Sequence, residues 1–181
     1  MITYTGSVYW AQRDAFQALV TALDRMPSVQ IQIVSDVHPE MLRGQGVWSD
    51  RLSVTHSELS GIADYQRRAD ILYLPLAFSS RAPDVIRTAA PGKLAEYLVA
   101  GVPILVHAPS FSYIATDARE HGWGFVVDTL DPAELADAIR MLLSDPELRR
   151  SVVKNAFAIA GSRHDALRGR EELRRHLGLD L

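Results

Sequence analysis

The segments DILYLPL (residues 70–76) and VPILVHA (residues 102–108) decide the fold of this chain. Residues 71–74 and 104–106 are apolar at every position, which is typical of strands that are covered on both faces. Parallel strands of this kind occur in sheets that carry helices on either side. The two segments therefore predict central strands of a parallel sheet.

Short β-branched segments alternate with amphipathic helical patterns on either side of these strands. Strands are predicted at residues 1–6, 29–35, 51–56, 70–76, 102–108 and 124–128, and helices at residues 14–26, 58–68, 93–101, 111–120 and 132–144. This alternation is typical of βαβ units. We therefore predict an α/β fold, a Rossmann-like doubly wound parallel sheet of about six strands with helices on both faces.

The capping pattern predicts where several helices begin. Asp14 and Asp131 each precede a glutamine or glutamate by three residues, as in a capping box. Asp145 is followed by proline and begins another helix, so the C-terminus is predicted to be helical. Its final segment, residues 164–181, combines leucines with many charges and predicts a surface-packed or partner-facing helix.

Composition limits the classes of function. With 181 residues, 48% hydrophobic residues, 23% charged residues and a net charge of -3, the chain predicts one globular domain without a basic footprint for nucleic acid. It has no cysteine, no signal-peptide pattern and no apolar run near the roughly 20 residues that span a bilayer. We expect a cytoplasmic protein without an integral membrane segment. The six histidines show no metal-binding spacing, so neither a metal nor another cofactor is predicted.

Ligands of parallel α/β sheets bind beyond the carboxyl ends of the strands, where the strand order reverses. Three segments follow predicted strands in this way: residues 5–14, 55–58 and 77–93. The last is much longer than the roughly 2 to 6 residues of a typical strand-to-helix connection, which favours a functional role. It leads into the predicted helix at residues 93–101.

The stretch APGKLAEYLVAG (residues 90–101) predicts an anion site. A helix that begins near Gly92 directs free N–H groups and a partial charge of about +0.5 towards the crevice, and Lys93 adds a full charge. Glu96 lies one turn along on the same face. A phosphate would repel this carboxylate unless Glu96 accepts hydrogen bonds from a neighbouring diol such as a ribose. Alternatively, Lys93 and Glu96 form a solvated pair worth about 0.2–0.5 kcal/mol.

Four stretches of the chain resemble the C-terminal, donor-binding domain of GT-B glycosyltransferases. They are YTGSVY (4–9), RRADILYLPL (67–76), APGKLAEYLVAGVPILVHAP (90–109) and GWGFVVDTLDPAELADAIRMLLSDPELRRSVVKNA (122–156). The resemblance is to the large retaining family with sucrose and glycogen synthase-like enzymes, in the subgroup with a Pro-x-Lys-x-x-Glu-Tyr pattern.

The resemblance implies that residues 1–181 are one half of a GT-B enzyme and bind a nucleotide-diphosphate sugar. The enzyme would move the sugar to a glycan or small-molecule acceptor without a metal. The N-terminal acceptor domain is absent from the chain, so the isolated domain is expected to be inactive. Two alternatives remain open: a noncatalytic nucleotide-binding module, and half of a nucleotide-sugar 2-epimerase.

The resemblance also assigns roles to residues of the stretch at residues 88–96. Glu96 matches the second glutamate of the family's Glu-x7-Glu motif, which binds the ribose hydroxyls. Gly92 and Lys93 would face the diphosphate, which makes Lys93 the candidate catalytic residue. The first motif glutamate is replaced by Thr88, which leaves the placement of the sugar-facing carboxylate open.

Further candidate binding residues lie in the other loops. Gly6 matches the turn after the first strand, where the diphosphate approaches, and Arg13 loosely matches a basic pair that follows this turn. His56 lies where the family holds the base, although it is equally read as an ordinary loop histidine. Arg81 and Arg87 are placed within reach of phosphate or sugar, or are simply solvated.

Overall fold

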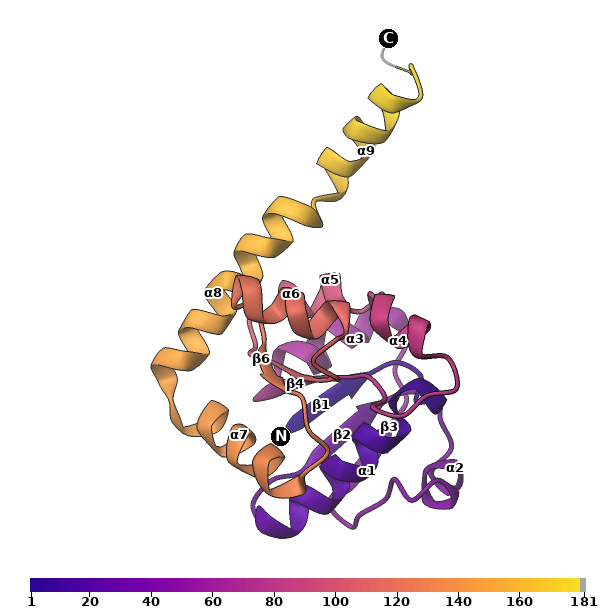
Figure 1. Cartoon of the computed structure of the whole chain (residues 1–181), viewed down its shortest axis with the longest axis vertical. Helices are drawn as coiled ribbons and strands as arrows, with labels where there is room; N and C mark the ends of the chain where they lie inside the picture. Colours follow the sequence, from indigo (N-terminus) through magenta and orange to yellow (C-terminus); the bar gives the residue numbers. More distant parts are fainter. Residues whose placement is uncertain (180–181) are drawn as a thin grey trace.

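The computed structural model describes residues 1–179 and contains one six-stranded sheet (Figure 1). The strands are β1 (Ile2–Thr5), β2 (Ile31–Val34), β3 (Leu52–Thr55), β4 (Ile71–Pro75), β5 (Ile104–His107) and β6 (Phe125–Val127). All neighbouring strands are parallel, in the order β3-β2-β1-β4-β5-β6. The predicted α/β fold is confirmed, and both apolar segments that predicted it form interior strands.

The helices of the described residues are α1 (Arg13–Ala22), α2 (Pro39–Gly44), α3 (Leu59–Arg67), α4 (Pro83–Thr88), α5 (Leu94–Leu98), α6 (Tyr113–His121), α7 (Pro132–Ser144), α8 (Pro146–Arg163) and α9 (Ala166–His176). Helix α4 lies in the long connection of residues 77–93, and α2 lies in a segment for which no helix or strand was predicted. Each has a proline in its first turn, which is pre-organised for a helix because its φ is fixed.

Two hydrophobic cores lie on opposite faces of the sheet. Helices α1 and α7 cover one face, and their buried side chains include Phe16, Leu19, Leu135, Ile139 and Leu142. Helices α5, α6 and α8 cover the other face (Figure 1), with Leu94, Tyr97, Leu98, Ile114 and Ala156 buried there. The apolar face of α5 is turned towards the sheet. Each face of the sheet is therefore sealed by helices, as a doubly wound fold requires.

The strand order reverses between β1 and β4. From β1 the chain moves outward through β2 to β3, then returns to place β4 on the other side of β1. The segments that follow β1 and β4 therefore leave the sheet in opposite directions and create a crevice between them. The loops that the sequence singled out, after β1, β3 and β4, all lie at this end of the sheet.

Carboxylate caps explain two of the three predicted helix starts. The Asp131 carboxylate accepts a hydrogen bond from the backbone N–H of Ala133 (2.8 Å), and Asp145 caps α8 in the same way. The prediction for Asp14 is wrong, because α1 begins one residue earlier, at Arg13. The Asp14 carboxylate instead accepts hydrogen bonds from the distant backbone N–H groups of Phe78 (3.0 Å) and Ser79 (2.8 Å).

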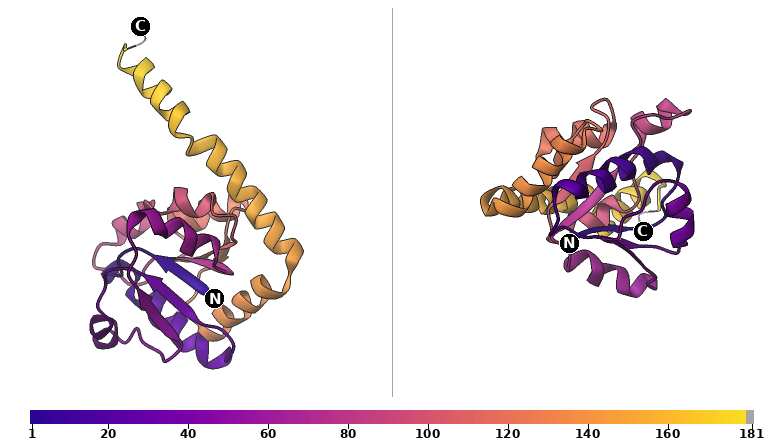
Figure 2. Two further views of the ribbon diagram at one scale, coloured as in Figure 1. Left: turned by 180° about the vertical axis from the view of Figure 1, so that it is seen from behind. Right: turned by 90° about the horizontal axis from the view of Figure 1, so that it is seen from below.

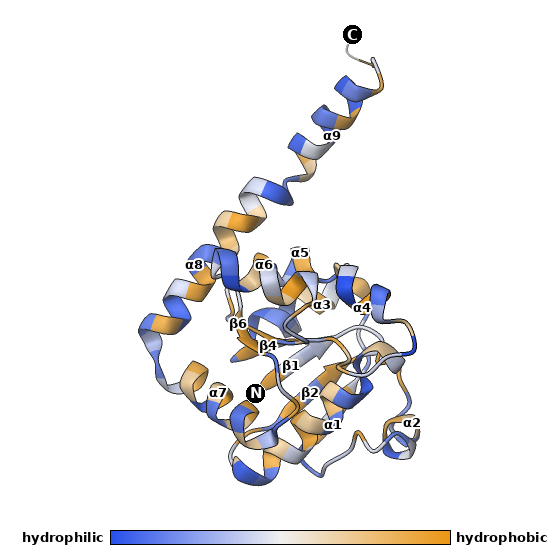
Figure 3. Ribbon diagram, viewed as in Figure 1, coloured by the Kyte–Doolittle hydropathy of each residue, from blue (hydrophilic) through white to orange (hydrophobic). Residues whose placement is uncertain are grey.

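The C-terminal helices extend away from the body of the domain (Figures 1 and 2). Helix α8 packs against α5 and α7, whereas α9 has no buried residue. Most of α9 is hydrophilic, with a few apolar residues (Figure 3). The predicted helical C-terminus is confirmed as far as His176, where α9 ends, and α9 buries no residue against the domain. Residues 180 and 181 of that prediction lie outside the described residues. No helix within residues 1–179 has the length and apolar character needed to cross a membrane.

Candidate functional site

The turn after β1 brings Gly6 next to Lys93. Gly6 has a φ of +107°, which favours glycine, and a Cβ atom at this position would lie 3.2 Å from the Lys93 Nζ. Its backbone N–H donates to the Val34 carbonyl at 2.9 Å, which continues the pairing of β1 with β2. Glycine therefore both permits the turn and leaves room for the lysine side chain. Two of the candidate residues, which are far apart in the sequence, meet at the switch point of the sheet.

The Lys93 ammonium is held by an aromatic side chain rather than by a carboxylate. Its Nζ donates to the Tyr4 hydroxyl at 2.6 Å and lies 3.9 Å from the centre of the Tyr4 ring. Among the described residues, no carboxylate lies within 4.0 Å of it. Burial lowers the pKa of Lys93 to about 8, and the charge of Glu96 opposes this change. The site therefore contains a desolvated cation without a carboxylate in contact.

Tyr4 is fixed from several sides. Its ring packs edge-on against Phe16, with the ring centres 5.0 Å apart. Its hydroxyl lies 2.6 Å from the Ser7 carbonyl and 3.1 Å from the Gln12 side-chain oxygen, both of which accept hydrogen bonds. Burial strongly raises the pKa of Tyr4, so its hydroxyl remains neutral and supplies an oxygen to Lys93. The lysine is thereby held in one position beside the Gly6 turn.

Glu96 is oriented by Gln66, a residue of α3 that the sequence analysis did not identify. The Gln66 Nε2 donates to the Glu96 carboxylate at 3.0 Å and to the Thr5 hydroxyl at 3.2 Å. Gln66 is only 3% exposed, while Glu96 is exposed to solvent. The one feature of the sequence that could have identified Gln66 is its position four residues after Ile62, on the same face of the predicted helix.

Tyr97 ties α5 to the end of β1. Its hydroxyl accepts a hydrogen bond from the backbone N–H of Thr5 at 2.9 Å. Burial raises the pKa of Tyr97 to about 12. Tyr97 is fully buried and belongs to the hydrophobic core on the α5 face of the sheet. Its contact with Thr5 anchors the segment that carries Lys93 and Glu96, which precede Tyr97 in the chain, to the end of β1.

Two adjacent cavities lie beside Glu96 and Gly6. One, of about 320 Å³, is lined by Glu96, Gln66, Leu59 and Ile62 among others. The second, of about 380 Å³, is also lined by Leu59 and Ile62, and in addition by Gly6, Ser7, Ser35, Asp36 and His56. Because they share two residues, the cavities form one groove along α3. Four of the predicted residues thus border one region: Gly6, His56 and Glu96 line the groove, and Lys93 lies against Gly6.

His56 follows β3, and its ring contacts the carboxylate of Asp36, which follows β2. Both side chains are exposed. The contact holds the ring at the rim of the groove, at the opposite end from Glu96. His56 is therefore accessible to a ligand from solvent.

Helix α5 is shorter than predicted and begins later. It covers only Leu94–Leu98, with Lys93 as its N-cap, because Pro91 and Gly92 form a turn in which the Leu94 N–H donates to the Pro91 carbonyl at 2.9 Å. Gly92 is exposed and has open space around it. The expectation of a helix that starts near Gly92 is corrected. A five-residue helix contributes little dipole, so the positive charge of this site comes from the Lys93 side chain.

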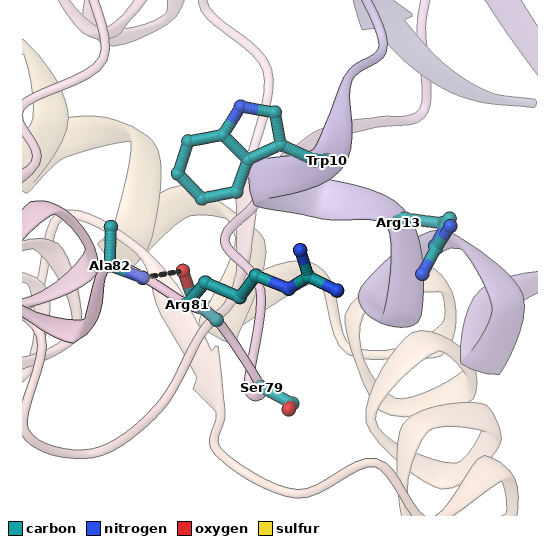
Figure 4. A pocket seen from close by; sticks show the side chains of 6 residues that line it. Trp10, Arg13, Ser79, Arg81 and Ala82 are labelled. Atoms are coloured by element: carbon teal, nitrogen blue, oxygen red, sulfur yellow. Dashed lines mark hydrogen bonds between the residues drawn. The ribbon is translucent and has the colours of Figure 1, made fainter.

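The other candidate residues lie outside this groove. Thr88 is the last residue of α4 and donates its hydroxyl hydrogen to the Asp84 carbonyl at 2.9 Å. Arg87 pairs with the Asp84 carboxylate and lies 5.6 Å from the Phe111 ring. Arg13 and Arg81 line a separate cavity together with Trp10 (Figure 4).

The fold and this groove define a doubly wound α/β domain with a crevice at its switch point, beside which the Lys93 ammonium lies. Residues 1–145 match the family described as glycosyl transferases group 1, and the chain belongs to that family. No curated protein matches the chain in sequence.

Solved structures with similar folds include the C-terminal domain of a glycosyl transferase group 1 family protein (LpcC) from Francisella tularensis. It is 14% identical, with a TM-score of 0.60, over 91% of this chain and 86% of that one. Sucrose-phosphate synthase from Thermosynechococcus elongatus is 17% identical, with a TM-score of 0.70, over 98% of this chain and 46% of that one. HepE from Anabaena, solved in complex with UDP-glucose, is 17% identical, with a TM-score of 0.70, over 98% of this chain and 49% of that one.

These relationships establish a domain of the glycosyl transferases group 1 family. The identities are low, so the solved structures support the fold, while the sequence match supports the family. This chain spans slightly less than half of the sucrose-phosphate synthase and of HepE.

Proposed function

We propose that this domain binds the nucleotide-diphosphate sugar of a glycosyl transfer reaction, with the diphosphate at Lys93 and Gly6. The observation that carries the proposal is the Lys93 ammonium, which is desolvated, held on Tyr4 and without a carboxylate within salt-bridge distance among the described residues. A diphosphate supplies the missing negative charge. The glycine turn allows such a group to approach the backbone closely.

The remaining residues of the groove match the other parts of such a ligand. Glu96, held by Gln66, presents a carboxylate that can accept hydrogen bonds from both ribose hydroxyls. The cavity beside His56 would hold the base. The similar fold of HepE, a protein solved with UDP-glucose, supports a ligand of this class.

In the reaction, the bond between the anomeric carbon and the diphosphate oxygen breaks, and negative charge develops on the leaving diphosphate. Lys93 would stabilise this charge because its position is fixed before the reaction begins. The proposed role requires no metal ion, because the lysine supplies the positive charge. The hydroxyl oxygen of a glycan or small-molecule acceptor would then bond to the anomeric carbon, and its proton would pass to the leaving diphosphate.

We also propose that transfer requires a second domain that closes over this groove. Glu96 and His56 are exposed, so the described residues cover only one side of the proposed ligand. A site of this kind neither excludes water nor positions an acceptor. The isolated chain should bind nucleotides but show negligible transfer from labelled nucleotide-sugars to glycan acceptors. Rapid transfer by this chain alone would contradict this part of the proposal.

Calorimetric titration with UDP, GDP and ADP tests the binding site. Lys93→Met should weaken binding of the tightest-binding nucleotide by about tenfold or more, because a charged hydrogen bond contributes about 1.5–3 kcal/mol. Lys154→Met is the matched control, since Lys154 is an exposed lysine on α8. Glu96→Ala should weaken binding to a similar extent, with Glu171→Ala on α9 as its control. Equal affinity of the Lys93→Met and Lys154→Met variants would overturn the assignment.

A further inference from the structure

We propose that the cavity lined by Trp10, Arg13 and Arg81 binds a saccharide that carries a carboxylate or phosphate group. The cavity has a volume of about 520 Å³ and is also lined by Ser79, Ser80 and Ala82. It lies between the segment that follows β1 and the segment that follows β4, at the same end of the sheet as the nucleotide groove. Its lining includes neither Lys93 nor Glu96, so the proposal does not depend on nucleotide binding.

The two segments that form the cavity are held together by the protein itself. The Ala77 N–H donates to the Ala11 carbonyl at 2.7 Å, and both residues are buried. The Asp14 carboxylate accepts hydrogen bonds from the N–H groups of Phe78 and Ser79. These contacts fix the walls before any ligand arrives. A preformed cavity of this volume falls within the range of about 300–1,000 Å³ that is usual for small-molecule sites.

Two positive side chains enter this space. Figure 4 shows the guanidinium of Arg81 extending between Trp10 and Arg13. Neither arginine forms a salt bridge with another described residue, although nine other arginines in the described chain do so. Asp14, the neighbour of Arg13, uses its carboxylate for the backbone of the opposite wall. A carboxylate or phosphate between the two guanidinium groups would relieve their repulsion and accept bidentate hydrogen bonds.

The exposed indole ring of Trp10 is the feature that favours a saccharide over a simple anion as the ligand. Its side chain is 54% exposed, and no cation lies over its ring among the described residues. Its flat apolar surface would pack against the C–H groups of a pyranose ring. The nearby hydroxyl of Ser79 is exposed and is available to the sugar hydroxyls. An aromatic platform beside two guanidinium groups therefore fits a uronic acid or a sugar phosphate, which share this chemistry.

Titration of the whole chain with four probes, in the absence of nucleotide, tests this proposal. The probes are glucuronate, glucose 6-phosphate, glucose and inorganic phosphate, and the readouts are calorimetry and tryptophan fluorescence. We expect one or both acidic sugars to bind about tenfold more tightly than glucose and than inorganic phosphate. Tighter binding of glucuronate would show that the cavity prefers a carboxylate, and tighter binding of glucose 6-phosphate would show that it prefers a phosphate. The ligand should change the fluorescence of the wild type but not that of Trp10→Phe.

Two matched variants complete the test. Arg81→Gln should weaken binding of the acidic sugar by about tenfold. Arg87→Gln, an exposed arginine of the same connection between β4 and α5, should bind it like the wild type. Thermal unfolding of both variants verifies that they fold. The proposal is overturned if the acidic sugars bind no better than glucose, if inorganic phosphate binds equally well, or if the two arginine variants bind alike.

Discussion

Lys93 carries a positive charge in an environment that disfavours its protonated form. Its ordinary pKa is 10.5, and burial on the Tyr4 ring lowers this value to about 8. The ammonium is therefore still mostly protonated near pH 7, where it can bind an anion. It loses its proton far more readily than a solvated lysine does. The free energy that is lost when the ammonium is desolvated is recovered when a diphosphate binds.

The affinity for nucleotide diphosphates should fall as the pH rises from 7 to 9. In this range the free protein loses the Lys93 proton, whereas the bound diphosphate favours the charged form. The decrease should approach about tenfold per pH unit above pH 8. Titrations at pH 7, 8 and 9 measure it. Lys93→Arg should show little dependence on pH because arginine stays charged. A flat profile for the wild type would argue against contact between Lys93 and the diphosphate.

Gln66 should act as a positioning residue for Glu96. Gln66→Leu removes the amide that holds the carboxylate, so binding of UDP should weaken by about three- to tenfold. The preference for UDP over 2′-deoxy-UDP should shrink as well, because Glu96 no longer points reliably at the ribose hydroxyls. A purely structural role would not change this ratio. Gln17→Leu is the control, since Gln17 bonds to the Gln45 carbonyl elsewhere.

At the scale of elements, a buried carboxylate joins α6 to α8. The Asp117 side chain accepts hydrogen bonds from the Trp123 indole N–H at 2.7 Å and from Arg163 of α8 at 2.6 Å. Burial by itself would raise the pKa of Asp117, but these two hydrogen bonds outweigh it and hold the pKa below its usual value. The link secures α8 against the second core at the point where the chain leaves the body of the domain.

Asp117→Ala should lower the free energy of unfolding by about 1–3 kcal/mol, because the Trp123 N–H would be left buried without an acceptor. Urea unfolding measures this change. Asp137→Ala, which breaks an exposed pair with Arg140, should cost less than about 1 kcal/mol. The pKa of Asp117 is lowered on folding, so its contribution is present above its ordinary pKa and is lost as the pH falls below it. The difference from wild type should therefore shrink in acid.

At the scale of the whole molecule, the described domain is complete without α9. The two cores are closed by α1 and α7 on one face and by α5, α6 and α8 on the other. Helix α9 extends beyond them, and its residues are exposed throughout. Its contribution to the stability of the domain should therefore be small.

Deletion of residues 165–181 should change the free energy of unfolding by less than about 0.5 kcal/mol, because no buried contact is lost. Chemical unfolding of the shortened chain provides the measurement. A longer deletion, from residue 146, serves as the comparison. It removes the buried Val152, Ala156 and Ala160 and uncovers part of the second core, so it should destabilise the domain strongly. Equal effects of the two deletions would show that α9 has a structural role in the free chain.

The elements that the sequence predicted well are those with local signals. The six strands follow from short β-branched segments, and the caps at Asp131 and Asp145 depend on atoms within a few residues. Asp14 has the same local pattern, but its carboxylate binds N–H groups 64 and 65 residues away. Local sequence cannot distinguish these two uses of a carboxylate. Short helices such as α2 and α4 have too few residues for a helical period to stand out.

The sequence by itself determined the parallel α/β architecture, the apolar strands and the family, because each is encoded in local patterns of residues. Only the tertiary structure decided which residues meet. The strand order places Lys93 on Tyr4, 89 residues away, brings Gln66 to Glu96, and separates Arg13 from the groove along α3. Hydrogen bonds and burial across the switch point depend on distances in space. The electrostatic properties of the groove therefore emerge only after the chain has folded.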